Sequence, residues 1–391
     1  MDSRTGLPVV GMVGGGQLAR MTHQAAIALG QSLRVLALSP DDGAALVAAD
    51  VRIGSHTDLA ALRDFADGCE VVTFDHEHVP TEHVRVLAEA GVTVYPPADA
   101  LLHAQDKQVM RERLSELGAP VPRWRPVSEP DDLVEFGNEL GWPVILKAAR
   151  GGYDGRGVWV VTGPEQATEL VGTLRAAGTP LIAEERVVLR RELAVQVARS
   201  PFGQVAAYPV VETVQRDGIC VEVLAPAPRL PEELAVAAQQ LGIDLATSLG
   251  VVGLLAVELF EVTGADGEPA LVVNELAMRP HNSGHWTIEG ARTSQFEQHL
   301  RAVLDYPMGD TALTAPVVVM ANVLGGPDGG MSIDERLHHL FAEDPGVKVH
   351  LYGKQTRPGR KIGHVTVLGD DLEKVRERAA RAAWWLREGH E

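Results

Sequence analysis

Cysteine is scarce in this 391-residue chain, which contains only Cys69 and Cys220. Two cysteines cannot build a disulfide framework or a cysteine-ligated zinc site, and they fit a reducing compartment. Positive charge is also in short supply, because 35 Lys and Arg residues stand against 53 Asp and Glu residues, for a net charge of -18. This balance excludes a general binder of nucleic acids or anionic membranes, which needs an excess of basic residues over a broad face. Any anionic ligand must therefore meet a local basic cluster.

Long apolar runs are missing as well. Residues 1–8 lack a basic start followed by a long apolar stretch, so we expect no signal peptide. The most apolar stretch, 249–260, is too short to span a bilayer and contains Glu258. The length and the 45% apolar content suit two to three ordinary domains. The chain is therefore predicted to be a multidomain enzyme of the cytoplasm.

The N-terminal region alternates strands and helices. A strand over 8–13, a glycine turn over 14–16, a helix over 18–29 and a strand over 33–38 form a βαβ unit. Gly14, Gly16 and Ala19 match the short G-x-G-x-x-G/A pattern of dinucleotide-binding turns. Asp41 or Asp42, beyond the second strand, stands where such proteins have an acid that binds the ribose. Tight packing of strand against helix explains these glycines equally well.

A second polar segment follows the strand over 71–74. Asp75-His76-Glu77-His78 stands at the carboxyl end of that strand, where open α/β sheets bind their ligands. Four polar residues in a row also suit a solvated loop. The segment is therefore a candidate ligand contact that needs support from elsewhere in the chain.

The most informative segment is glycine-rich and reads Gly151-Gly152-Tyr153-Asp154-Gly155-Arg156-Gly157. It lies between two runs with strand character, 143–147 and 158–161, so it is predicted to be a hairpin loop. The familiar phosphate loop instead opens a helix and ends in Gly-Lys-Ser/Thr. Unobstructed backbone N–H groups and the charge of Arg156 would let this loop fold over a polyphosphate as a flap. A flexible hairpin without a ligand is the alternative.

Two further strands, over 254–260 and 270–276, each place one carboxylate in an apolar run. They are joined by a turn near 265–267 and can pair as a hairpin, which would bring Glu258 and Glu275 together. Their repulsion would have to be relieved by a shared cation or proton. Hard carboxylate oxygens suit Mg²⁺ that bridges to substrate phosphates. Alternatively, each glutamate pairs with an arginine or lies at a strand end in water.

The remaining pattern gives the other elements. We expect helices over 100–117, 131–140, 164–176 and 231–242, and strands over 181–184 and 192–197. Near the C-terminus we expect strands over 317–324, 347–352 and 364–368 and a closing helix over 371–386. Between them, four of the eight residues of 354–361 are basic. This run is either a solvated loop or a site for a nucleotide 5′-phosphate, which we favour because Pro358-Gly359 tightens the loop.

A helical lysine, a strand lysine, the glycine flap, an acidic hinge strand and two metal-type glutamates together resemble the ATP-grasp superfamily. The runs 15–21, 274–286 and 357–364 are further similar to the N5-carboxyaminoimidazole ribonucleotide synthetase family, and the resemblance covers essentially the whole chain. It implies an α/β fold with α+β elements. An N-terminal Rossmann-like pre-ATP-grasp domain would span 1–105, an ATP-grasp domain 106–307 with its flap subdomain at about 120–187, and a small β-rich C-terminal domain 308–391.

The resemblance also implies an activity. Members of this family are ligases that form a carbon–nitrogen bond in de novo purine (IMP) biosynthesis. They use ATP and Mg²⁺ to carboxylate 5-aminoimidazole ribonucleotide with bicarbonate, through carboxyphosphate, giving the N5-carboxy product, ADP and phosphate. Relatives are commonly homodimers, and no nucleic-acid or membrane partner is expected.

Site residues follow position by position from the resemblance. The ATP site would comprise Lys107, Lys147, Gly152, Tyr153, Asp154, Gly155, Arg156, Gly157, Val158, Glu184, Glu185, Arg186, Val187, Glu192, Gln215, Asn274 and Glu275. Glu258 and Glu275 would bind Mg²⁺. The ribonucleotide would contact Glu77, Tyr153, Arg279, His281, Asn282, Lys354, Arg360 and Lys361. Asp154, Arg156 and Lys354 would be catalytic.

Three positions depart from the family pattern. Lys107 stands where many relatives have Arg, Gln215 where many have His, and Met278 where Pro is common. Gln215 can form hydrogen bonds, but an acid or base role there is in doubt. His281 and His285 suit a structural role and a substrate contact equally.

Other function classes stay open on the residues alone. A different ATP-grasp ligase, such as a formate-dependent glycinamide ribonucleotide transformylase or a biotin carboxylase, would share the flap and the glutamates. An NAD-dependent dehydrogenase would use the Gly14 turn, and a nucleotide sensor would bind ATP without turnover.

Overall fold

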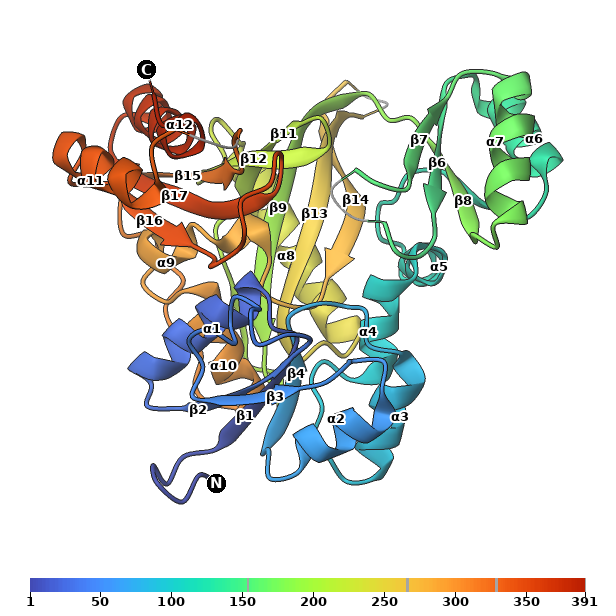
Figure 1. Ribbon diagram of the computed structural model, residues 1–391. Coiled ribbons are helices and arrows are strands. Elements are labelled where there is room, and N and C mark those ends of the chain that lie inside the picture. Colours follow the sequence, from blue (N-terminus) through green and yellow to red (C-terminus); the bar gives the residue numbers. More distant parts are fainter. Residues whose placement is uncertain (153–154, 265–266, 328–329, 391) are drawn as a thin grey trace.

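The structure is a computed structural model that describes residues 1–152, 155–264, 267–327 and 330–390. Its N-terminal part (blue in Figure 1) is a four-stranded parallel sheet with the strand order β3-β2-β1-β4. The elements are β1 (Val9–Val13), α1 (Gln17–Ala28), β2 (Ser32–Ala37), β3 (Asp50–Ile53), α2 (Leu59–Ala66), β4 (Val71–Phe74) and α3 (Thr81–Glu89). The predicted βαβ unit is confirmed. Because β1 and β4 are parallel neighbours, the glycine turn and Asp75 meet at one edge of the sheet.

The prediction of a single helix over 100–117 is wrong. The structure has two helices there, α4 (Ala98–Gln105) and α5 (Lys107–Glu116). Asp106 between them has an extended backbone, with φ −132° and ψ 111°, and its carboxylate accepts hydrogen bonds from the N–H groups of Gln108 and Val109. The aspartate therefore acts as an N-cap that starts a new helix. Lys107 consequently stands in the first turn of α5 rather than in the middle of a helix.

A small lobe (green in Figure 1) carries the glycine-rich loop. Its antiparallel sheet has the order β5-β8-β6-β7, and its helices α6 and α7 contribute to a hydrophobic core of its own. The elements are β5 (Trp124–Val127), α6 (Pro130–Leu140), β6 (Val144–Ala148), β7 (Val158–Val161), α7 (Pro164–Ala176) and β8 (Leu181–Glu185). β6 and β7 pair as the predicted hairpin, so the loop joins two strands.

The largest sheet has nine strands and is continuous from the middle of the chain to the C-terminal part. Its order is β14-β13-β9-β11-β12-β15-β17-β16, and β10 pairs with β9. The strands are β9 (Leu189–Arg199), β10 (Val205–Ala207), β11 (Val211–Arg216), β12 (Ile219–Ala225), β13 (Gly253–Thr263), β14 (Pro269–Ala277), β15 (Val317–Leu324), β16 (Lys348–Leu351) and β17 (Lys361–Gly369). The residues expected to form a separate C-terminal domain thus extend the sheet of the preceding domain through the β12–β15 pair.

Helices cover this sheet. They are α8 (Glu232–Ser248), the short α9 (Thr287–Gly290), α10 (Gln295–Val303), α11 (Ile333–Glu343) and α12 (Leu372–Glu388), with a 3₁₀ turn, η1, at Asn282–Gly284. α8 runs six residues past the predicted end at 242. In the part of the chain that the structure describes, no helix is sufficiently long and apolar to span a bilayer.

The hairpin of β13 and β14 confirms the expected pairing of the two carboxylates, because Glu258 lies opposite Glu275. The next pair is Leu259 with Val273, so Asn274 is an extra residue in β14. A bulge of this kind re-aims side chains that would otherwise alternate between the two faces of the sheet. It explains how Asn274 and Glu275, which are consecutive, both reach the same cavity.

Candidate functional site

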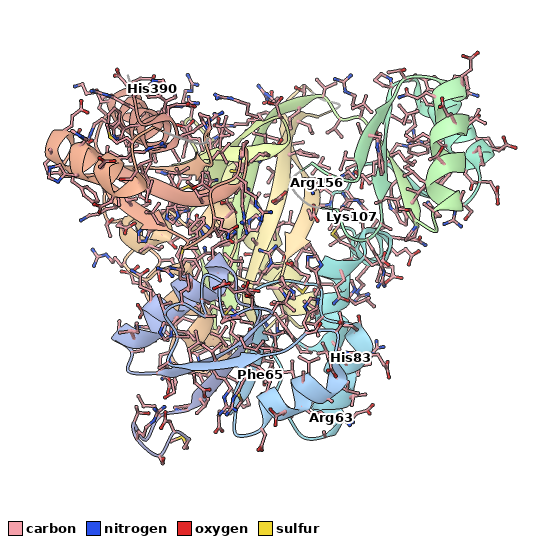
Figure 2. The ribbon with its side chains drawn as sticks, viewed as in Figure 1. Arg63, Phe65, His83, Lys107, Arg156 and His390 are labelled. Atoms are coloured by element: carbon pink, nitrogen blue, oxygen red, sulfur yellow. The ribbon has the colours of Figure 1, made fainter. Side chains whose placement is uncertain are left out.

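A cavity of about 1920 Å³ lies where the three parts of the molecule meet. The glycine turn and residues 75–81 line it from the N-terminal sheet, the flap strands and hinge line it from the small lobe, and β11, β13 and β14 line it from the large sheet. Figure 2 shows Lys107 and Arg156 in the region between the small lobe and the large sheet. Convergence of three parts on one large cleft is the usual setting of an enzyme active site.

The paired carboxylates form one wall of the cavity. The amide nitrogen of Asn274 donates to Glu258 at 3.3 Å, and His281 Nε2 lies 3.4 Å from the same carboxyl group. Burial raises the pKa of Glu258 to about 7, and Glu275 and Glu192 act in the same direction. Burial also lowers the pKa of His281 to about 3, so this ring is neutral at physiological pH. Glu258 therefore lacks a cationic partner of its own among the described residues and keeps a high affinity for a proton or a cation.

A buried ionic cluster adjoins these carboxylates, because the Asn274 side chain bonds both groups. Lys147 Nζ lies 2.7 Å from Glu184 and 3.1 Å from the Asn274 side-chain oxygen. Arg111 is fully buried, with Nε 2.8 Å from Glu184 and Nη2 2.6 Å from the Asn274 carbonyl oxygen. Burial would raise the pKa of Glu184, but Lys147 and Arg111 outweigh it and hold that pKa below its usual value. The cluster therefore fixes Lys147 at the base of the flap hairpin.

Lys107 connects the carboxylate pair to the base of the flap. Its ammonium group pairs with Glu275, and its backbone N–H donates to Ala149 beside the flap at 2.8 Å. Arg150 binds the capping Asp106 at 2.7 Å, which ties the flap base to the start of α5. A helix N-terminus with a lysine in its first turn is a favourable environment for a phosphate.

The Asp75 carboxylate packs closely against the glycine turn. Gly14 has φ +113°, and a Cβ there would lie 1.7 Å from the Asp75 carboxylate, which accepts a hydrogen bond from Gly16 N–H at 2.7 Å. Asp42 accepts bonds from Leu38 and Ser39 N–H, so its carboxylate closes the turn after β2. The glycines are therefore required by the close approach of the Asp75 and Asp42 side chains, and the Asp42 carboxylate is engaged by the backbone of its own turn.

Asp75 gives a pH-dependent prediction. Burial raises the pKa of the Asp75 carboxyl from 3.8 to about 6, although the Gly16 N–H group and Arg279 both act to lower it. The folded state therefore binds this proton more tightly than the unfolded state does. Protonation of Asp75 stabilises the fold below about pH 4, and this stabilisation is lost as pH rises through about 6. The difference in free energy of unfolding between Asp75→Asn and the native chain should rise by roughly 2–3 kcal/mol in favour of the variant from pH 4 to pH 7.5. Thermal unfolding at both pH values measures this, and an unchanged difference between the two chains would contradict it.

The predicted site residues converge to a large extent. Those that line the cavity are Glu77, Lys107, Lys147, Gly152, Gly155, Val158, Glu184, Glu185, Arg186, Val187, Glu192, Gln215, Glu258, Asn274, Glu275, Arg279, His281, Asn282 and Lys361. Tyr153 and Asp154 lie outside the described residues. Arg279 Nε binds Glu77 at 2.7 Å, which joins the large sheet to the polar segment after β4.

Four predicted residues do not line the cavity. Arg156 and Gly157 belong to the flap, and Lys354 and Arg360 belong to the basic loop before β17. Lys354 donates to Gln17 in the N-terminal part, and Arg360 is exposed, with a 3.4 Å bond to the Gln355 carbonyl oxygen. In this conformation the basic loop therefore stands beside the cavity, and Lys361 is its inward-facing member.

Sequence reasoning missed Arg111, although a signal was present. It follows Lys107 by four residues and so lies on the same face of a helix. Gln295, which holds the His281 loop, gave no comparable signal because it is an uncharged residue whose bonds to His281 are to backbone atoms.

Three family models cover most of the chain. An ATP-grasp domain matches residues 112–296, a ribonucleotide synthetase preATP-grasp domain matches 7–105, and a phosphoribosylaminoimidazole carboxylase C-terminal domain matches 318–378. The chain is 62% identical to an N5-carboxyaminoimidazole ribonucleotide synthase of Mycobacterium tuberculosis, over 98% of this chain and 88% of that protein. The chain belongs to the N5-carboxyaminoimidazole ribonucleotide synthase family.

Solved structures agree with this membership. The synthetase from Thermus thermophilus is 40% identical, with a TM-score of 0.84 over 96% of this chain and 98% of that chain. The synthase from Aspergillus clavatus, determined with ADP and 5-aminoimidazole ribonucleotide, is 33% identical, with a TM-score of 0.85 over 97% and 98%. The prediction of an ATP-grasp ligase of purine biosynthesis, with an α/β fold built from pre-ATP-grasp, ATP-grasp and C-terminal parts, is thereby confirmed.

Proposed function

We propose that this member of the N5-carboxyaminoimidazole ribonucleotide synthase family activates bicarbonate with ATP and transfers the carboxyl group to 5-aminoimidazole ribonucleotide in the cavity described above. One observation carries the proposal: paired carboxylates, a buried lysine cluster and an arginine–glutamate pair face one cavity from three parts of the chain. The structure of the Aspergillus clavatus relative in complex with ADP and the ribonucleotide supports the assignment of both ligands to this cavity.

ATP would lie between the flap lobe and the large sheet. Lys107 and Lys147 would neutralise its phosphates, the backbone of the flap would cover them, and the hinge at 184–187 would contact the base. Glu192 would take the ribose, and burial already raises the pKa of that carboxyl. Gln215 lies close enough to Glu192 to donate a hydrogen bond. The His-to-Gln departure at Gln215 thus keeps a hydrogen-bonding group at the site.

Glu258 and Glu275 would hold Mg²⁺. The donor set fits this ion, because two carboxylates face each other, Asn274 lies beside them, and burial with neighbouring negative charge raises the pKa of Glu258 to about 7. When bound, the ion would neutralise charge on the phosphates. Bicarbonate oxygen then attacks the γ-phosphorus in line, and ADP leaves with the electron pair of the broken bond.

The product of this step is carboxyphosphate, which breaks into CO₂ and phosphate. The exocyclic amine of the ribonucleotide then attacks CO₂ and loses a proton. Arg279, held by Glu77, and the His281–Asn282 pair would orient the anionic reactants, while Asp154, Arg156 and Lys354 would act at the reacting atoms. Closure of the flap keeps water away from carboxyphosphate, which would otherwise hydrolyse.

The activity is tested by ADP release from the purified chain. We expect ADP formation to require both 5-aminoimidazole ribonucleotide and bicarbonate, and omission of Mg²⁺ to stop it. Stimulation by formate with glycinamide ribonucleotide, or by biotin, would instead identify another ATP-grasp ligase. ATP binding without turnover would identify a nucleotide sensor. A homodimer and a cytoplasmic location are also proposed, and sedimentation of the free chain tests the former.

Arg360 tests the placement of the ribonucleotide phosphate. If the basic loop closes on this phosphate, Arg360→Ala removes a charge-assisted contact and should weaken ribonucleotide binding roughly tenfold to more than a hundredfold. ATP affinity should change little. Arg360→Lys should restore only part of the loss, because an ammonium group lacks the forked geometry of a guanidinium.

Lys348→Ala is the control for the Arg360 variants, since it removes one exposed positive charge from the neighbouring strand β16. Calorimetric titration of both ligands decides the outcome. Equal weakening of ATP and ribonucleotide by Arg360→Ala, or no weakening of either, would contradict the placement.

A further inference from the structure

Gln295 holds the loop of residues 281–285, which contributes four residues to the cavity wall. It is the first residue of α10 and is fully buried. The His281 N–H donates to its Oε1 at 2.9 Å, and its Nε2 donates to the His281 carbonyl oxygen at 2.8 Å. Both polar backbone atoms of His281 are therefore clamped by one side chain.

The clamp also fixes a proton on a second histidine. A backbone N–H can only donate and a carbonyl can only accept, so the two bonds to His281 assign the oxygen and nitrogen of the Gln295 amide without ambiguity. The Nε2 also lies 3.1 Å from His285 Nδ1. Since Nε2 can only donate, His285 Nδ1 must be an acceptor, and the neutral ring must carry its hydrogen on Nε2.

The surroundings of His285 maintain this state. Its ring is 1% exposed, and burial lowers its pKa well below the usual value, so the ring is neutral. In the described part of the chain, His285 Nε2 is buried and has no hydrogen-bond partner. A buried donor without a partner costs free energy, so the orientation that Gln295 imposes on this ring calls for a functional explanation.

The packing of the loop depends on the same amide. A Cβ on Gly284 would lie 2.4 Å from Gln295 Oε1, so the loop can approach the amide only with glycine there. Ser283 in turn accepts a bond from the buried Gln196 at 2.7 Å. Two buried glutamines, neither of which lines the cavity, thus hold the loop.

We propose that Gln295 is a positioning residue for the second substrate: it fixes the 281–285 loop against the cavity and sets His285 as the Nε2–H tautomer. The inference rests on the proposed function, because the ribonucleotide is the ligand assigned to this loop. It concerns how the loop is held, and Gln295 itself takes no part in the chemistry.

The chain offers a matched control on the same helix. Gln298 is also fully buried, and it clamps Gly309 in the same way, with Gly309 N–H donating at 2.8 Å and the Gly309 carbonyl accepting at 2.9 Å. Gly309 does not line the cavity. Gln298→Met therefore removes the same type of clamp from the same helix without affecting the 281–285 loop.

The experiment compares Gln295→Met with Gln298→Met in the ADP-release assay. Losing the two bonds to His281 and the bond to His285 should raise the KM for the ribonucleotide about tenfold or more in Gln295→Met, with the KM for ATP within about twofold. Gln298→Met should show a similar loss of thermal stability and leave both KM values within about twofold. Equal effects of the two variants on the ribonucleotide KM, or an equal rise in both KM values of Gln295→Met, would overturn the inference.

The tautomer is measured separately, so the inference is testable even if Gln295→Met does not fold. In ¹⁵N-histidine spectra, with the His285 signals assigned by their loss in His285→Asn, we expect the hydrogen on Nε2. In Gln295→Glu the carboxylate cannot donate to Nδ1, and we expect the hydrogen to move to Nδ1 or the ring to become charged. A hydrogen on Nδ1 of His285 in the unmodified chain would overturn the assignment.

The outcomes separate this inference from the proposed function. If the unmodified chain shows no ribonucleotide-dependent ADP release, the proposed function fails. If that release is present and Gln295→Met behaves like Gln298→Met, only the positioning role fails.

Discussion

Replacing Glu275 with glutamine is expected to lower ADP formation roughly a hundredfold or more while leaving the fold intact. The amide keeps the shape of the side chain but removes the negative charge that faces Glu258 across the hairpin. A neutral oxygen is a much weaker ligand for a hard divalent cation, and stabilisation of charge during phosphoryl transfer is usually the largest catalytic contribution. The measurement is steady-state ADP release at saturating Mg²⁺, ATP, ribonucleotide and bicarbonate.

The control for this variant is Glu116→Gln, at an exposed pair on α5. It carries the same chemical change and should retain normal turnover. Circular dichroism and thermal unfolding establish that Glu275→Gln is folded. Turnover near that of the unmodified chain from a folded Glu275→Gln protein would remove Glu275 from the metal site.

The second large effect is expected from Arg111→Met, and it concerns stability. Arg111 is fully buried and bonds both Glu184 and the Asn274 carbonyl, so the variant leaves a buried carboxylate with Lys147 as its sole close cation among the described residues. Breaking a buried ion pair by removing one partner typically costs about 3–5 kcal/mol. A lower denaturant midpoint and a loss of ATP affinity should appear together, because the same cluster holds Lys147.

Arg113→Met on the same helix supplies the comparison. Its guanidinium pairs with Glu116 on the surface, where such a pair is worth about 0.3–0.5 kcal/mol. If the two variants unfold at the same denaturant concentration, the buried cluster does not have the structural role assigned to it.

Sequence patterns predicted the elements of the site better than their fine geometry. Alternation, turn residues and single carboxylates in apolar strands were enough to predict the hairpin that pairs Glu258 with Glu275. The bulge at Asn274 was not predictable, because a strand pattern with a period of two assigns consecutive residues to opposite faces. Only the pairing partners in the folded sheet reveal the extra residue.

Two other differences have clear physical causes. Asp106 interrupts a stretch of good helix formers, and an aspartate inside a helical pattern cannot be distinguished from an N-cap until its backbone conformation is known. The continuity of the large sheet depends on the pairing of β12 with β15, strands separated by about ninety residues. Periodicity predicts that both are strands but carries no information about which strands become neighbours.

The prediction of individual ligand contacts was less complete. Lys361 lines the cavity while its neighbour Arg360 is exposed, although both belong to one basic run. Charge composition predicts a phosphate site near the run but not which side chain points inward. Gln295 illustrates the converse, since an uncharged residue in an ordinary helix start gave no reason to single it out.

The β12–β15 pair also bears on how the protein is made. Residues up to about 105 contain all four strands of the parallel sheet, so these strands can pair early in synthesis. The large sheet, in contrast, has an open edge at β12 until β15 and β17 have been synthesised. Lys361, which lines the cavity, is the first residue of β17. A nascent chain therefore remains without a finished cavity wall until β17 has been synthesised, and a premature stop before β17 would release a protein that lacks Lys361 and exposes a strand edge.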